Sequence, residues 1–176
     1  MKLINKLTKY SWCLLLLTSM GQADVLVDVT ATMISPACDI RSEDSSSPLK
    51  ISFGIIKIDN LSDLSVMQNF PLYISGCHIN KDLAIMLEPK NDGSLVYNGK
   101  AILATSTDGL GIDISDITGG KVRSLNVGIK QLVYPEKIDA TQYRMDLQAQ
   151  LVNTVPVSQL AVGKFTSTMM VLVTYN

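Results

Sequence analysis

Three cysteines, Cys13, Cys38 and Cys77, and a single histidine, His78, have the most distinctive chemistry in this 176-residue chain. Thiols can form disulfides, bind metals or act as nucleophiles, and histidine can bind metals or transfer protons. A metal site needs further ligands, and the chain has no histidine pair to supply them. A Ser-His-Asp arrangement would have to use His78, beside a cysteine, and no nucleophile-elbow sequence is present. We therefore expect no catalytic residues, no metal site and no cofactor.

The first 23 residues determine the expected compartment. Three lysines precede an apolar run from Trp12 to Leu17, and Gly21-Gln22-Ala23 follows. This order is typical of a secretory signal peptide, with cleavage before Asp24. The apolar run is too short to span a bilayer, and no stop-transfer stretch follows that would favour an anchored helix instead. We expect a mature protein outside the cytosol, without a membrane span.

Cleavage would leave 153 of the 176 residues. The signal peptide contains three of the 15 basic residues and none of the 16 acidic ones, so the mature net charge is −4. This balance provides no basic stripe for nucleic acid or anionic lipid, so neither is an expected partner. The length fits one domain with a substantial core.

The signal peptide also contains Cys13, which leaves Cys38 and Cys77 in the mature chain. Two thiols in an oxidising compartment indicate one disulfide. On the chain-entropy model, closing a loop of about 39 residues stabilises the fold by roughly 4 kcal/mol. A reactive or metal-binding thiol is the competing interpretation.

Period-two alternation of apolar and polar residues recurs along the mature chain and predicts strands. No segment keeps a helical stripe over three turns, and clusters of Gly, Pro, Asn and Asp separate the alternating segments, which indicates a single all-β sandwich. The segments are residues 24–34, 49–58, 69–79, 82–89, 109–122, 143–153 and 163–176.

The two end segments raise a common problem. A long, uncharged, apolar strand at the end of a chain is an aggregation hazard unless something covers it. At the other end, only residues 34–37 separate the first alternating segment from Cys38, too few for it to fold back as a hairpin partner. Pairing of both strands within one ordinary sandwich is one solution. The simpler joint solution is strand addition between chains, in which one molecule's first strand lies beside another's last strand.

The whole mature chain resembles pilin subunits of the chaperone–usher pathway, close to the minor pilins of P and type 1 fimbriae. The matching features are an alternating arm opened by Asp24-Val25, the cysteine of "SPACDI", "NFPLYISGC" ending at Cys77, and the glycine-rich "GLGIDISDITGG". Tyr175 is a penultimate aromatic residue, and Gly163 is fourteenth from the C-terminus.

The resemblance implies an incomplete immunoglobulin-like sandwich that lacks its last strand, with an N-terminal donor-strand extension. Its expected parts are a signal peptide (1–23), a donor arm (24–34) and a pilin domain (35–176). The arm would insert the side chains of Val25, Val27, Val29, Ala31 and Met33. The family often has glycine in mid-arm, where this chain has Ala31, which affects how tightly that part inserts. The expected chaperone and acceptor groove comprises Gly163, Phe165, Met169, Val171, Val173, Tyr175 and Asn176, with the Asn176 carboxylate held by basic chaperone residues.

The resemblance further implies a structural subunit of a surface fimbria, with a periplasmic chaperone, an outer-membrane usher and neighbouring pilins as partners. The protein would pass through the periplasm to the cell surface. Alternatives are a carbohydrate-binding fimbrial adhesin and a self-contained secreted immunoglobulin-like binding module. A two-domain adhesin would need more than 153 residues and usually lacks a donor arm. Adaptor, tip-shaft, initiator and terminator positions share these sequence signals.

Overall fold

The computed structural model of the chain describes residues 38–43, 49–62, 66–77 and 82–175. Within these ranges the chain forms strands and three short 3-10 helices, and no α-helix. The helices are η1 (Ile58–Ser62), η2 (Thr118–Gly120) and η3 (Val157–Gln159). Residues 35–176 form one compact unit. The prediction of an all-β fold is confirmed.

The larger sheet is antiparallel and has β10 (Gln142–Asn153) at its centre, paired with β2 on one side and β6 on the other. Its strand order is β1-β2-β10-β6-β5-β4, with β7 added beside β6 and β9 beside β10. The other strands are β1 (Asp39–Arg41), β2 (Met67–Ser75), β4 (Ser94–Tyr97), β5 (Lys100–Ala104), β6 (Leu110–Asp116), β7 (Arg123–Leu125) and β9 (Glu136–Lys137).

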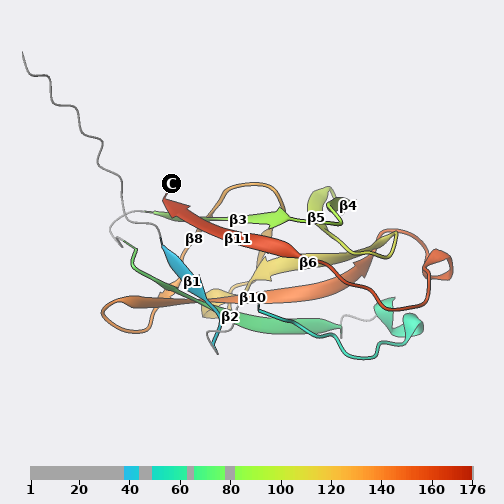
Figure 1. The fold of residues 1–176 in the computed structure, drawn as a ribbon, viewed down its shortest axis with the longest axis horizontal. Coiled ribbons are helices and arrows are strands. Elements are labelled where there is room, and N and C mark those ends of the chain that lie inside the picture. Colours follow the sequence, from blue (N-terminus) through green and yellow to red (C-terminus); the bar gives the residue numbers. More distant parts are fainter. Residues whose placement is uncertain (1–37, 44–48, 63–65, 78–81, 176) are drawn as a thin grey trace, which may run out of the picture. The chain divides into compact units, whose positions relative to one another are not determined.

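The smaller sheet contains three strands in the order β11-β3-β8. These are β11 (Met169–Tyr175), β3 (Leu83–Pro89) and β8 (Gln131–Val133). Figure 1 shows β3 and β11 in one layer and β2 and β10 in the facing layer. The arrangement is a two-layer sandwich of antiparallel sheets.

The core lies between the two layers. Alternate residues of β10 point inward, and Met145 and Leu147 are fully buried there. Ile85 and Leu87 of β3 meet this core from the smaller sheet and are also fully buried. The period-two pattern that predicted these strands therefore does mark their inward faces.

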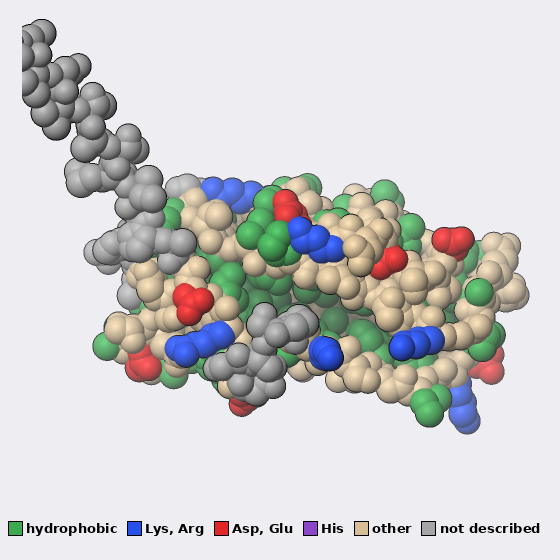
Figure 2. Space-filling model, in the orientation of Figure 1, with side chains coloured by type: hydrophobic (Ala, Val, Ile, Leu, Met, Phe, Trp, Pro, Cys, Tyr) green, Lys and Arg blue, Asp and Glu red, His purple; other side chains and the backbone are tan. Residues whose placement is uncertain are grey.

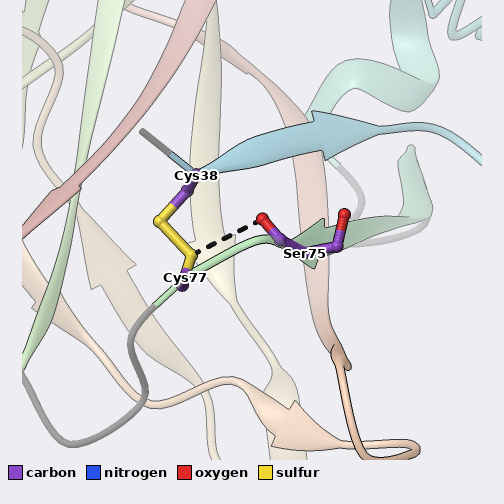
Figure 3. Close-up of a disulfide and its surroundings, with 3 residues drawn as sticks. All are labelled: Cys38, Ser75 and Cys77. Atoms are coloured by element: carbon purple, nitrogen blue, oxygen red, sulfur yellow. Dashed lines mark hydrogen bonds between the residues drawn. A yellow bond between two sulfur atoms is a disulfide. The ribbon is translucent and has the colours of Figure 1, made fainter. Parts of the chain in front are cut away.

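The predicted disulfide between Cys38 and Cys77 is present, with Cα atoms 4.8 Å apart. It joins Cys38, directly before β1, to Cys77, two residues after the end of β2 (Figure 3). Asp39 faces Ser75 in the β1–β2 pairing, so the bridge continues the ladder by a covalent link. The Cys77 sulfur lies 3.9 Å from the Ser75 carbonyl oxygen; because a disulfide sulfur carries no hydrogen, this is a contact and not a hydrogen bond.

The glycine-rich segment 109–122 has a steric explanation. Gly109 has φ +76°, and a Cβ there would lie 2.4 Å from a methyl group of Val155. A Cβ on Gly111 would lie 2.4 Å from Ile102 Cδ1. After β6, the carboxylate of Asp116 accepts a hydrogen bond from the Thr118 N–H at 2.9 Å and so fixes the turn at η2.

Several sequence predictions need correction. Residues 49–58 were predicted as a strand, but residues 49–57 pair with no strand among the described residues and Ile58 begins η1. The final strand begins at Met169 and not at Gly163. The predicted strands within 69–79, 82–89, 109–122 and 143–153 are confirmed as β2, β3, β6 and β10. The predicted donor arm, 24–34, lies outside the described residues.

Candidate functional site: a strand-accepting groove

Among the described residues, β11 has a neighbouring strand on only one side. It pairs with β3 along its whole length, from Met169 opposite Pro89 to Tyr175 opposite Leu83. No described strand pairs with its other edge. The described strands thus leave the sandwich open beside β11.

The direction of the free backbone groups follows from the register. The Lys90 N–H donates to the Thr168 carbonyl oxygen at 2.9 Å, so Thr168 and every second residue after it bond toward β3. Pro89 lies at a non-bonded position opposite Met169, as a residue without an N–H must. The N–H and C=O groups of Met169, Val171 and Val173 therefore point to the open edge, where a further strand could bond with them.

The inward side chains of β11 are incompletely covered. Val171 lies opposite Leu87 and Val173 opposite Ile85. Both β3 residues are 0% exposed, whereas both valines are only half-buried although they pack against the same core. β3 is flanked by β11 and β8, whereas β11 has a described strand only on the side of β3. Among the described residues, the incomplete cover of the two valines therefore lies at the unpaired edge of β11, where an added strand would bury them further.

The opposite side of this opening is formed by β1 and residues 49–57. Ile40, Ile51, Phe53 and Ile56 are half-buried and contact the core from this side. We call the space between this wall and β11 the acceptor groove. Figure 2 shows hydrophobic side chains exposed along a hollow between the layer of β11 and the layer below it.

Different contacts mark the two ends of the groove. At the first end, the Lys130 ammonium donates to the Tyr175 carbonyl oxygen at 2.7 Å. At the second end, Phe53 and Phe165 contact each other, with ring centroids 6.4 Å apart. Phe165 lies upstream of β11, so this contact connects the two walls.

The structure brings together most of the groove residues named from the sequence. Met169, Val171, Val173 and Tyr175 lie in a row along β11, and Phe165 continues that row. Gly163 lies on an exposed bend, and a Cβ there would meet nothing within 4 Å. Its φ of +158° is a backbone conformation that side-chain-bearing residues rarely adopt, which is a reason for glycine at this position. Asn176, like the donor residues Val25, Val27, Val29, Ala31 and Met33, lies outside the described residues.

The opposite wall was missed as part of the site. Ile51 and Phe53 alternate with polar or small residues in "LKISFG", and Ile40 lies two residues after Cys38. The sequence could not place them at the groove, because that requires knowing which strand lies across the sandwich from β11.

Other functional chemistry finds little support in the described part of the chain. No group of three or more His, Cys, Asp or Glu side chains there could hold a metal ion. None of the helices described is long and apolar enough to cross a membrane.

Comparison with known proteins finds similar structures but no match by sequence. No protein-family model and no curated protein matches the chain. Among solved structures, the P pilus rod subunit PapA is similar with a TM-score of 0.58 and 15% identity, over 80% of this chain and 100% of that chain. The P pilus adaptor subunit PapF is similar with a TM-score of 0.54 and 18% identity, over 81% of this chain and 98% of that chain. The chain therefore has the incomplete immunoglobulin-like fold of pilus subunits, as its sequence resemblance predicted.

Proposed function

We propose that the chain is a structural subunit of a surface fimbria, joined to its neighbour by an inserted strand. The observation that carries this proposal is the row of half-buried side chains along the open edge of β11, next to fully buried partners on β3. A long, uncharged, apolar edge strand is an aggregation hazard unless another strand covers it. A donor strand from another molecule would complete both the core and the backbone pairing.

The donor that we propose is the N-terminal arm, residues 24–34, of a neighbouring subunit. Its alternating Val25, Val27, Val29, Ala31 and Met33 match the period of β11. Burying three valines and a methionine contributes roughly 6–12 kcal/mol at about 1.5–3 kcal/mol each, as an upper bound. That magnitude suffices for a stable non-covalent link before backbone pairing is added.

An exposed apolar groove promotes aggregation during export, so the subunit needs a partner that covers the groove. We propose that a periplasmic chaperone lends a strand to the groove and that the exchange for a subunit arm occurs at an outer-membrane usher. The Asn176 carboxylate would anchor the chain end to basic chaperone residues. In this proposal the protein is exported through the periplasm, ends in a fimbrium outside the cell and has no catalytic role.

A minor position in the fimbrium, such as adaptor or terminator, and a contribution to adhesion are the finer parts of the proposal. They rest on the sequence resemblance alone.

The experiment that tests the proposal is donor-peptide capture. The chain from Asp24 is refolded by dilution with a large excess of the labelled peptide "DVLVDVTATMI", and the peptide-bound monomer is isolated by size-exclusion chromatography. We expect a one-to-one complex, whereas a peptide with Val27→Asp should bind weakly, because it places an unpaired charge in the core. A monodisperse, soluble chain that captures no peptide would contradict the proposed function.

A further inference from the structure

The rings of Phe53 and Phe165 bring the two walls of the acceptor groove into contact at one end. Their planes are inclined by 45° and their centroids are 6.4 Å apart, within the range of attractive aromatic pairs. Both rings are half-buried and pack against the core. A strand that entered the groove along β11 would meet this pair where the walls converge.

Phe165 belongs to a wall that is firmly attached to the rest of the domain. The Ser106 N–H donates to the Thr166 carbonyl oxygen at 2.9 Å, and the Thr166 N–H donates to Ser106 Oγ at 3.0 Å. Ser167 Oγ donates to the Ala104 carbonyl oxygen at 2.5 Å. These bonds fix the backbone immediately after Phe165.

Phe53 belongs to a wall that is attached more weakly. Residues 49–57 pair with no described strand. The hydrogen bonds described for them are local: the Gly54 N–H donates to Ser52 Oγ at 3.2 Å, and the Lys57 carbonyl oxygen accepts from the Asn60 N–H at 2.9 Å. Segments without ladder bonds open more easily than strands within a sheet. Phe53 is therefore held mainly by packing, and its substitution is the direct way to open this end of the groove.

We propose that the Phe53–Phe165 pair closes one end of the acceptor groove, so that a donor strand binds along β11 and stops at the two rings. This inference rests on the proposed function and specifies how much of a donor the groove accepts. The inward side chains of β11 are Met169, Val171, Val173 and Tyr175. The arm offers five alternate side chains for these four apolar positions, and the fifth would lie beside Ser167, between Met169 and the rings, where the hydroxyl is already bonded to the Ala104 carbonyl oxygen. The side chain at the closed end therefore contributes little to binding.

Truncated donor peptides test this closure. The full arm peptide, 24–34, is compared with a peptide that lacks Asp24 and Val25 and with one that lacks Met33 and Ile34. Both truncations are needed, because the direction of the donor decides which end meets the rings. Each peptide competes with labelled full-length arm for the refolded chain, in the wild type and in Phe53→Ala.

In the wild type we expect one truncation to change the affinity less than about threefold and the other to weaken it at least about tenfold, the effect of losing one buried aliphatic side chain. In Phe53→Ala the tolerated truncation should also become costly, by about tenfold, because the opened end now accepts the extra side chain. Phe165→Leu should produce the same change from the other wall if Phe53→Ala folds poorly. Ile55→Ala is the matched control, since Ile55 lies on the same segment and is fully exposed.

The possible results separate failure of the closure from failure of the proposed function. Comparable losses for both truncations in the wild type would show a groove open along its whole length and overturn the closure. Truncation costs that are the same in the wild type, Phe53→Ala and Phe165→Leu would overturn it as well. If the full arm peptide bound to none of these proteins, the proposed function itself would fail, which is distinguishable from either result.

Discussion

A carboxylate placed at the centre of β11 should abolish strand insertion while leaving the domain folded. Val171 lies mid-strand, opposite the fully buried Leu87, but is itself only half-buried. In Val171→Asp the carboxylate keeps contact with water as long as the groove is empty. A donor strand would cover it and remove that water without supplying a partner.

The magnitude follows from two contributions. Complete burial of a valine is worth about 1.5–3 kcal/mol, of which roughly half remains for the donor to contribute at this site. Leaving a buried charge without a partner costs about 3–5 kcal/mol. The groove edge keeps some solvent access, so we expect a loss of at least about 3 kcal/mol, or roughly 100-fold in affinity.

The assay is competition for the arm peptide 24–34, with Thr174→Asp as the matched control. Thr174 lies on the same strand, is exposed and faces away from the core. Its substitution should change the affinity less than about threefold, and circular dichroism should show both variants folded. Equal losses for the two variants, or full binding by Val171→Asp, would refute the assignment of β11 as the donor-facing strand.

Three further predictions concern the rest of the chain. Intact-mass measurement after alkylation without reductant should find no free thiol in the mature protein, and replacing Cys38 and Cys77 by serine should lower the free energy of unfolding by up to roughly 4 kcal/mol; two alkyl groups on the untreated protein would disprove the bridge. Gly109→Ala should destabilise the domain by about 1–3 kcal/mol in thermal melts, because the new Cβ would clash with Val155 at a positive φ, whereas Gly120→Ala, also at positive φ but with open space around it, should cost less. Deleting Asp24–Ile34 should leave a subunit that still binds the arm peptide but cannot donate to a second subunit, and loss of folding on this deletion would favour a self-contained sandwich.

The alternation of apolar residues predicted much of the sheet correctly, because each of the strands β2, β3, β6 and β10 buries one face. The hairpin of β4 and β5 was missed although its turn contains Asn98-Gly99, a strong hairpin signal. Both turn residues have positive φ, at 49° and 79°. β4 lies at the edge of the larger sheet, where Val96 is 73% exposed, and in β5 the buried residues Ile102, Leu103 and Ala104 are consecutive, so neither strand shows a clear alternation.

The site shows a different limit of sequence reasoning. Alternation along residues 49–57 was sufficient to predict a strand, yet Ile51 and Phe53 contact the core from a segment without strand pairing. The alternation of apolar residues shows which side chains face inward, but it does not show whether the segment pairs with another strand. The same ambiguity applies to β11, whose missing neighbour could be inferred only by considering both chain ends together.

The most direct test of strand acceptance is amide hydrogen exchange along β11, measured residue by residue with and without the arm peptide. The amides of Met170, Leu172 and Thr174 already bond toward β3, so their protection should change little. The amides of Val171 and Val173 point to the open edge, and we expect them to exchange fast in the free chain and to become protected when the peptide binds. Protection of these two amides before any donor is added, or no change on peptide binding, would contradict an open groove that is completed by another molecule's strand.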